Sequence, residues 1–303
     1  MPASSLRPLT LEDRLWFEAR LAAHPVPGDQ LAAYSVPYHV IWRDLLTYEW
    51  LELESHACLV AGHADGCFLA LPPIGPDPCG PALSRAFAFL SERNTVTALT
   101  RIENVPESLA ACCRDRGYRV VSKGPDYLYR RDELVGLHGD RFKSQRVDYN
   151  HCVKQARPAL RAFRPEDADA CCALYRQWRN GVEGDAASLA RHMAADAESA
   201  HRAGISHATE LGLQGLVVEV EGRVVAYTFG YPLNAQTFCV LFEIADRKVR
   251  GLGAYIFREF CRELEGYEMI NTMDDSGLDG LRRAKLASHP IRLVESFIVS
   301  PAS

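Results

Sequence analysis

Three long apolar runs in the second half of the chain limit the choice of fold more than any other feature. They occupy residues 213–220, 224–233 and 237–245 and are rich in β-branched and aromatic side chains. Only the polar turn at 221–223 separates the first run from the second, which is typical of a β-hairpin. At 251–266, Tyr255, Ile256, Phe260 and Leu264 recur at helical spacing, which predicts an amphipathic helix directly after the third strand.

The two halves of the chain share one order of elements. In the second half we expect, besides these, a strand from residue 159, helices entered at 165–167 and spanning 184–204, and strands at 268–273 and 292–300. In the first half we expect helices at 11–23, 40–47, 81–94 and 105–117, and strands at 46–54, 57–73 (a hairpin turning near 64–66), 95–104 and 118–131. The sequence therefore predicts an α+β protein with mixed sheets: domains at 1–140 and 159–303 and a basic linker at 141–158.

Length and composition are those of a globular protein with two ordinary domains. The chain has 303 residues, of which 48% are hydrophobic and 24% charged. No apolar run approaches the roughly 20 residues of a membrane span, and the first residues lack the apolar stretch of a signal peptide. We therefore expect a cytoplasmic protein without a membrane span.

Cysteine and histidine patterns do not indicate a metal site. The ten cysteines include two adjacent pairs, at 112–113 and 171–172, and no C-x-x-C occurs. No H-x-x-x-H or H-E-x-x-H occurs among the ten histidines. We expect buried, reduced thiols and no bound metal.

Charge is unevenly distributed. The net charge of −5 does not favour nucleic-acid binding by the whole surface. The segment 141–164 differs, because its only acidic residue is Asp148. It contains seven cations: Arg141, Lys143, Arg146, Lys154, Arg157, Arg161 and Arg164. This stretch is either a solvated linker or a contact for an anionic partner.

The join between the third strand and the amphipathic helix is rich in glycine. Its sequence, KVRGLGA, contains Lys248, Arg250, Gly251 and Gly253. Glycines let main-chain N–H groups approach an anion, and a helix N-terminus favours negative charge. Together with the element order, the join resembles the phosphate-binding loop of GNAT-fold acyltransferases, which implies that these four residues bind a cofactor. The alternative is a tight turn with close packing.

A second pattern, INTMDDSGLDGLRRAKLASHP at 270–290, is more specific. The chain resembles the C-terminal domain of phosphatidylglycerol lysyltransferases, in which two GNAT-like folds are joined in tandem. The resemblance rests on Asn271, Met273, Asp275, Gly277, Gly280, Leu281, Arg282, Lys285 and Pro290. Earlier matching positions are Trp42, Tyr48, Pro72, Pro73, Gly75, Asp126, Tyr127, Leu128, Tyr129, Leu137, Gly139, Lys143, Gln145, Arg146 and Val147. It covers nearly the whole chain and implies two tandem GNAT-like acyltransferase domains.

The residue types in these motifs suit acyl transfer from an activated ester. Arg282 and Lys285, three apart on a helix, share one face and could stabilise negative charge. Asp275 or Glu243, on the third strand, could accept the proton of an acceptor amine. We expect substrate contacts from Asn271, Lys143, Arg146 and Tyr129. The alternative for Asp275 is an internal ion pair with Arg282 or Lys285.

Three functions remain open at this stage. The resemblance favours tRNA-dependent aminoacyl transfer to an amine or hydroxyl of a small molecule, peptide or lipid head group, with aminoacyl-tRNA as donor. The glycine loop favours a CoA-dependent N-acyltransferase that uses acetyl-CoA. A binding module without catalysis would suit Met273, which stands where the family pattern has an acid.

Overall fold

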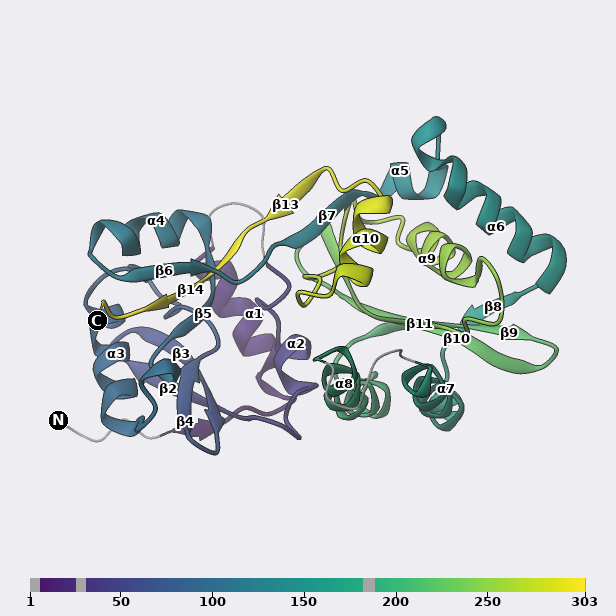
Figure 1. Ribbon diagram of the computed structural model, residues 1–303. Coiled ribbons are helices and arrows are strands. Elements are labelled where there is room, and N and C mark those ends of the chain that lie inside the picture. The colour runs from purple at the N-terminus through teal and green to yellow at the C-terminus, as the bar shows by residue number, and fades with distance from the viewer. Residues whose placement is uncertain (1–5, 26–30, 182–188, 303) are drawn as a thin grey trace. The chain divides into compact units, whose positions relative to one another are not determined.

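The chain forms two compact units in a computed structural model that describes residues 6–25, 31–181 and 189–302. Unit 1 comprises Met1–Asp126 and Val294–Ser303, and unit 2 comprises Tyr127–Leu293 (Figure 1). The sequence predicts domains at 1–140 and 159–303, and the limits of the two units differ from these. Unit 2 starts earlier than expected, and the last residues of the chain return to unit 1.

Unit 1 is built on a seven-stranded mixed sheet. The strand order is β1 (Arg7–Pro8), β2 (Thr47–Leu53), β3 (His56–His63), β4 (Gly66–Leu69), β5 (Ile102–Pro106), β14 (Ser296–Ser300) and β6 (Arg119–Ser122). Its helices are α1 (Asp13–Ala23), α2 (Val36–Val40), α3 (Pro81–Arg93) and α4 (Glu107–Asp115). Neighbouring residues of β2 point to opposite faces: Trp50 contacts Phe17 of α1, and Leu51 joins the core under α3 and α4.

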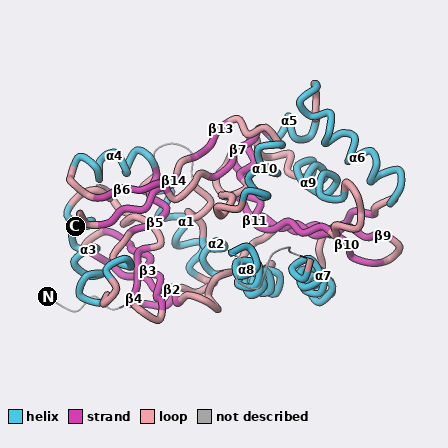
Figure 2. Tube along the Cα trace, in the orientation of Figure 1, coloured by secondary structure: helices cyan, strands magenta, loops and turns pink. Residues whose placement is uncertain are grey.

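Unit 2 has a second seven-stranded sheet. The strand order is β13 (Arg292–Val294), β7 (Asp126–Arg130), β12 (Met269–Asn271), β11 (Thr237–Ala245), β10 (Arg223–Pro232), β9 (Gln214–Val220) and β8 (Ala159–Ala162). Helices α7 (Ala168–Asn180) and α8 (Leu189–Ser206) lie on one face, and α6 (Lys143–Ala156) and α9 (Leu252–Glu263) on the other (Figure 2). The remaining helices are α5 (Arg131–Gly136) and α10 (Asp279–Ala287). The predicted hairpin, third strand and amphipathic helix are all present.

Each unit borrows one strand from the other half of the chain. In unit 1, β14 lies between β5 and β6 and runs antiparallel to both. In unit 2, β7 lies between β12 and β13 and runs antiparallel to β12. In each sheet, the strand from the other half of the chain lies beside the parallel pair, which is β4/β5 in unit 1 and β11/β12 in unit 2. The segment 118–131, expected as one extended piece, is divided between the two sheets as β6 and β7, and 292–300 is divided as β13 and β14.

Local differences from the expected elements have identifiable causes. The predicted linker at 141–158 is instead mostly α6, because Tyr149 stacks on Tyr255 of α9 at a ring distance of 5.6 Å. The helix expected at 40–47 lies earlier in the chain and ends at Val40. It begins after Ser35, whose hydroxyl caps it by accepting from the Tyr38 N–H. Of the strand expected at 95–104, only the end is strand, as the start of β5. Residues 184–188 of the expected helix lie outside the described residues.

One expectation about the cysteines is wrong. Cys79 and Cys112 form a disulfide that joins the segment before α3 to α4. The other eight cysteines are not in a disulfide, and seven of them are buried. Adjacent cysteines in a helix do not exclude a disulfide, because the partner of Cys112 lies in another element, 33 positions earlier.

Candidate functional site

Strands β11 and β12 separate partway along their length and leave an opening in the sheet of unit 2. They pair in parallel only from Thr237 to Cys239, where β12 reaches Asn271 and ends. Strand β11 continues to Ala245, and the pairing with β10 shifts register between Phe229 and Gly230. The last residues of β11 therefore lack β12 as a neighbour. Ligands of mixed sheets commonly bind where parallel strands part at their carboxyl ends.

Glu243 lies on this unpaired part of β11. Glu243 pairs across the sheet with Thr228 of β10. Burial raises the pKa of the Cys261 thiol in α9, and the charge of Glu243 raises it further. Glu243 therefore lies on the face of the sheet that α9 covers. Throughout the described part of the chain, no group forms a hydrogen bond or ion pair with its carboxylate. Its side chain is accessible to solvent, yet the surrounding protein desolvates it and raises its pKa to about 8. Water that reaches the carboxylate opposes this shift, but the pKa of Glu243 still moves toward neutral pH.

The glycine loop after β11 is partly explained by packing. Gly251 precedes α9 with φ +78°, and a Cβ there would lie 2.0 Å from the Asp148 carbonyl oxygen in α6. Arg250 forms an ion pair with the Asp148 carboxylate at 3.5 Å. Gly253 has open space around it, and the Lys248 side chain is exposed and has no ion-pair partner among the described residues. Gly251 thus serves close helix packing, whereas Lys248 and Gly253 are accessible.

Lys285 holds the chain that follows β12. Its ammonium donates to the main-chain oxygens of Thr272 at 2.5 Å, Met273 at 3.0 Å and Asp274. Met273 has a left-handed backbone with φ 64°, which turns these carbonyls together. Three acceptors around one ammonium are an internal anchor, so Lys285 shapes the loop.

Asp275 is also engaged within the motif. One carboxylate oxygen accepts from the Tyr127 hydroxyl at 2.5 Å, and the other accepts from the Gly277 N–H at 2.9 Å. Burial and this hydrogen bond raise the pKa of Tyr127 to about 12, so the phenol stays protonated. The ion pair expected between Asp275 and Arg282 or Lys285 is not among the interactions of the described residues. The D-Y-L-Y motif singles out Tyr127 in the sequence but does not indicate its hydrogen bond with Asp275.

Arg282 and Arg283 remain as the exposed cations of α10. Neither guanidinium forms a hydrogen bond or ion pair in the segments that the structure describes. The Arg282 charge is close enough to lower the pKa of the Tyr127 phenol against the larger effect of burial. Arg282 thus lies beside the Tyr127–Asp275 pair and is accessible to an anionic ligand.

Three of the four residues expected to contact substrate have internal partners. Asn271 is buried and accepts from the Met273 N–H at 2.7 Å. Tyr129 is buried and donates to the Lys285 carbonyl oxygen at 2.9 Å. Arg146 donates to the carbonyl oxygens of Leu137 and, at 2.6 Å, of Gly139. Lys143, at the start of α6, is exposed.

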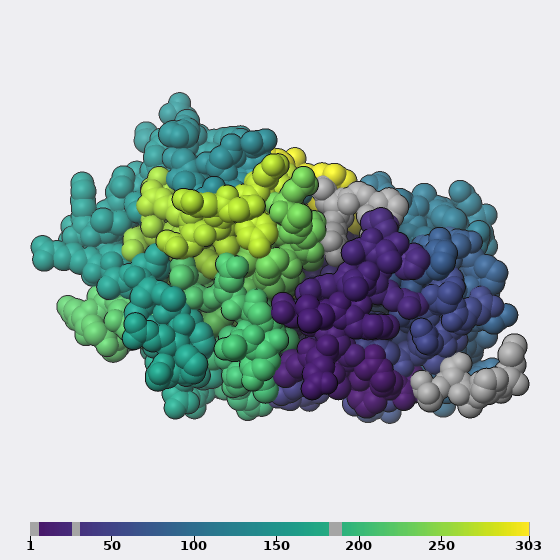
Figure 3. Space-filling model, turned by 180° about the vertical axis from the view of Figure 1, so that it is seen from behind, coloured from purple at the N-terminus to yellow at the C-terminus, as the bar shows by residue number. Residues whose placement is uncertain are grey.

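The basic segment divides into occupied and accessible cations. Arg141 pairs with Glu133, and Arg161 pairs with Asp167 and Glu219. Four cations are exposed and have no ion pair with a described residue: Lys143, Lys154, Arg157 and Arg164. The contact of Gly251 with Asp148 brings α6 alongside the loop that carries Lys248, and Figure 3 shows the teal of this part of the chain beside the yellow-green of α9. The loop that carries the accessible Lys248 therefore lies beside α6, the helix that bears Lys143 and Lys154.

The described residues contain neither a cluster of metal ligands nor a membrane-spanning helix. Among the described residues, no group of three or more histidine, cysteine or acidic side chains is placed to hold a metal ion. No helix within the described ranges is long and apolar enough to cross a membrane.

Comparison with known proteins identifies the fold and the family. A conserved protein of unknown function from Bacteroides thetaiotaomicron VPI-5482 is 23% identical, with TM-score 0.82, over 99% of this chain and 100% of that one. L-PGS from Bacillus licheniformis is 14% identical, with TM-score 0.65, over 95% and 92%. A tandem GNAT protein from the clavulanic acid biosynthesis pathway is 14% identical, with TM-score 0.54, over 99% and 98%. No curated protein sequence matches significantly. These likenesses show a tandem GNAT fold.

The sequence itself matches the profile of one family, described as phosphatidylglycerol lysyltransferase, C-terminal, over residues 29–300. The expected resemblance is confirmed. Because the match covers most of its length, the chain belongs to the phosphatidylglycerol lysyltransferase C-terminal family.

Proposed function

We propose that unit 2 transfers an aminoacyl group from aminoacyl-tRNA to an amine or hydroxyl acceptor. Family membership and the tandem GNAT fold support acyl or aminoacyl transfer as the general class. The observation that carries the proposal within the structure is Glu243: an accessible carboxylate of raised pKa in the opening between β11 and β12. Such a group can accept a proton near neutral pH.

The reaction needs alignment and one proton transfer. The acceptor nitrogen or oxygen attacks the ester carbonyl carbon, a tetrahedral intermediate forms, and the bond to the 3′-terminal ribose oxygen breaks. Glu243 takes the proton that the acceptor loses, and this proton finally neutralises the ribose oxygen. Arg282 is the accessible cation beside the loop after β12 and stabilises the negative charge that develops on the carbonyl oxygen.

Lys285 and Asp275 act differently from the roles their sequence motif suggests. Their hydrogen bonds with Thr272, Met273 and Tyr127 position the loop that precedes α10. We assign them as positioning residues. The donor phosphates are bound by the other accessible cations: Lys143, Lys154, Lys248 and Arg283.

A CoA-dependent acyl transfer is the second candidate. Lys248 and the open space at Gly253 favour it, because both lie where a pyrophosphate would meet the N-terminus of α9. The packing of Gly251 against Asp148 counts against it, since that glycine already has a structural purpose.

Filter binding separates the candidates. Aminoacylated tRNA should be retained by the protein at about 50 mM salt and much less at about 200 mM, because phosphate contacts release counterions. The double change Arg282→Ala with Arg283→Ala should weaken retention, whereas Arg116→Ala, an exposed arginine of unit 1, should not. Glu243→Gln should retain tRNA and lose transfer. A thermal shift with acetyl-CoA and no retention of tRNA would replace the proposal with the second candidate. If the protein shows neither a thermal shift nor retention of tRNA, it is a binding module without catalysis.

A further inference from the structure

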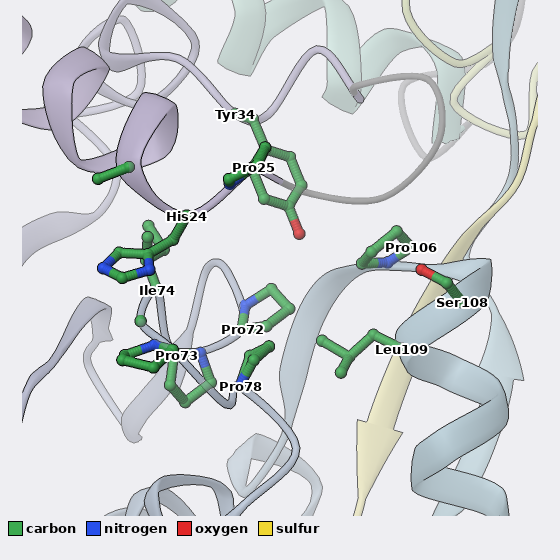
Figure 4. Close-up of a pocket in the computed structure, with 13 residues that line it drawn as sticks. His24, Pro25, Tyr34, Pro72, Pro73, Ile74, Pro78, Pro106, Ser108 and Leu109 are labelled. Carbon is green, nitrogen blue, oxygen red and sulfur yellow. The ribbon is translucent and has the colours of Figure 1, made fainter.

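A cavity of about 450 Å³ lies within unit 1, at the carboxyl ends of its parallel strands. Strands β4 and β5 pair at Leu69 and Ile102 and then diverge, and the segments that follow them form the walls (Figure 4). One wall is the segment 72–78 and another is the start of α4 at 106–109. The end of α1 and Tyr34 complete the lining. This volume is within the range of small-molecule sites.

The walls are rigid before any ligand arrives. Six of the lining residues are prolines, whose φ angles are fixed: Pro25, Pro72, Pro73, Pro76, Pro78 and Pro106. Ile74 is held to Ala57 of β3 by two main-chain hydrogen bonds, of 3.0 and 2.9 Å. The Cys79–Cys112 disulfide joins the end of the proline segment to α4. A cavity fixed in this way loses little conformational freedom on binding.

The described side chains that line the cavity are mostly uncharged. Among the described residues that line the cavity, none is Asp, Glu, Lys or Arg. Four of the seven residues at 72–78 are prolines, which have no N–H, so this segment offers few main-chain donors to a phosphate. Tyr34 is buried and donates to the Asn104 carbonyl oxygen at 3.1 Å. The polar side chains nearer to solvent are Ser108, which is exposed, and His24, which is partly exposed.

We propose that this cavity binds a neutral, flat aromatic molecule that carries one hydrogen-bonding group. Proline rings, Tyr34, Ile74 and Leu109 offer apolar surface to the ring, and Ser108 or His24 bonds the polar group at the mouth. A rigid ring suits rigid walls, because it gives up less conformational entropy than a flexible chain of equal size. The site does not depend on the proposed transfer reaction, since all its residues belong to unit 1.

Four small molecules of similar size test this ligand class. Benzamide is neutral and flat, benzoate is anionic, benzylamine is cationic, and hexanamide is neutral and flexible. We expect saturation-transfer NMR to show benzamide binding with a Kd on the order of 1 mM, and binding of the other three at least about tenfold weaker. Absence of benzamide binding at about 10 mM, or equal binding of benzoate or benzylamine, would overturn the proposal.

Filling the cavity tests the location. Leu109→Trp places an indole into the cavity from α4 and should abolish benzamide binding. Ala111→Trp adds the same indole to an exposed position of α4 and should leave binding unchanged. If Leu109→Trp does not fold, Ser108→Trp at the exposed mouth gives the same test. Unchanged binding in the filled variant would place the ligand elsewhere and refute this site.

Discussion

Gly251 at the start of α9 lies directly against the main-chain carbonyl of Asp148 in α6. A Cβ on Gly251 would come within 2.0 Å of that oxygen, and the backbone there is left-handed, with φ +78°. Two independent constraints, space and backbone conformation, therefore require glycine at this position. Gly253, two residues later, has neither constraint.

Gly251→Ala should destabilise unit 2, and Gly253→Ala should not. The left-handed backbone alone costs a non-glycine residue about 1–2 kcal/mol, and the clash with Asp148 adds to it. Alanine at 253 lies inside α9 and should raise the free energy of unfolding by up to about 1 kcal/mol. Urea unfolding measures both. Equal effects would mean that packing against α6 does not explain the glycine loop.

Lys285→Met should lower stability more than the loss of an exposed lysine. The change leaves the carbonyls of Thr272, Met273 and Asp274 without their shared donor, and hydrogen bonds to a charged group contribute about 1.5–3 kcal/mol each before water replaces them. Lys154→Met, at an exposed position of α6, should change stability by less than about 0.5 kcal/mol. If the two variants unfold at the same urea concentration, Lys285 is not an anchor.

Periodicity predicted most of the fold because each strand and helix carries its own signal. The hairpin, β11 and α9 could be predicted from residues 213–266 alone. The exchange of β7 and β14 could not, because strand partnership depends on which sheet edge is available in three dimensions. Local propensity is the same whichever sheet receives the strand. The disulfide was missed for the same reason: Cys112 finds Cys79 only after folding.

The structure separates the predicted site residues by their accessibility, which residue type alone does not indicate. Glu243 and Arg282 are accessible, as a role in transfer requires. Lys285 has the same charge and nearly the same place in sequence as Arg282, but it turns inward because three loop carbonyls converge on it. Loop conformation, including the left-handed Met273, decides this difference, and sequence spacing does not encode it.

Transfer activity should depend on a group that ionises near pH 8. Desolvation by the surrounding protein raises the pKa of Glu243 to about 8, and the base must be deprotonated, so the rate should rise with pH up to about 8. Glu243→Gln should lower kcat by about 100-fold or more and remove this dependence. Single-turnover rates between pH 6 and pH 9 give the profile. An unchanged profile in the variant would assign the base elsewhere.

The same residue should make stability fall as pH rises. The pKa of Glu243 in the folded state lies above its ordinary value of 4.5, so the folded state binds more protons between pH 4.5 and about 8. Its contribution is complete below pH 4.5 and is lost as pH rises through about 8. Glu243→Gln should therefore raise Tm relative to the unchanged protein at pH 9 more than at pH 4. The opposite trend would contradict the raised pKa.

Two buried histidines should act in the other direction. Burial lowers the pKa of His39 and of His201 to about 3, against 6.5 in the unfolded chain. The unfolded state therefore binds more protons between pH 3 and 6.5, and stability should fall as pH falls through that window. Each histidine contributes up to about 1.4 kcal/mol per pH unit.

Urea unfolding between pH 6.5 and 5 isolates this effect, because most carboxylates stay ionised there. Glu243 opposes it in that window, so all variants should carry Glu243→Gln. His39→Gln and His201→Gln should each flatten the pH dependence. His201 donates to or accepts from the Tyr227 hydroxyl at 2.8 Å, and glutamine can keep a hydrogen bond there. An unchanged slope in both variants would show that neither histidine controls acid stability.

Reduction of the Cys79–Cys112 disulfide should destabilise unit 1. The bond closes a loop with a sequence separation of 33, which corresponds to about 3–4 kcal/mol of stabilisation through the unfolded state. Cys112 is partly exposed, so a small thiol reductant can reach it. Urea unfolding with and without dithiothreitol should differ by this amount, and Cys112→Ser should unfold like the reduced protein and ignore the reductant. If the native protein without reductant is alkylated at both Cys79 and Cys112, the two residues are thiols, and the rigidity of the unit 1 cavity must come from its prolines alone.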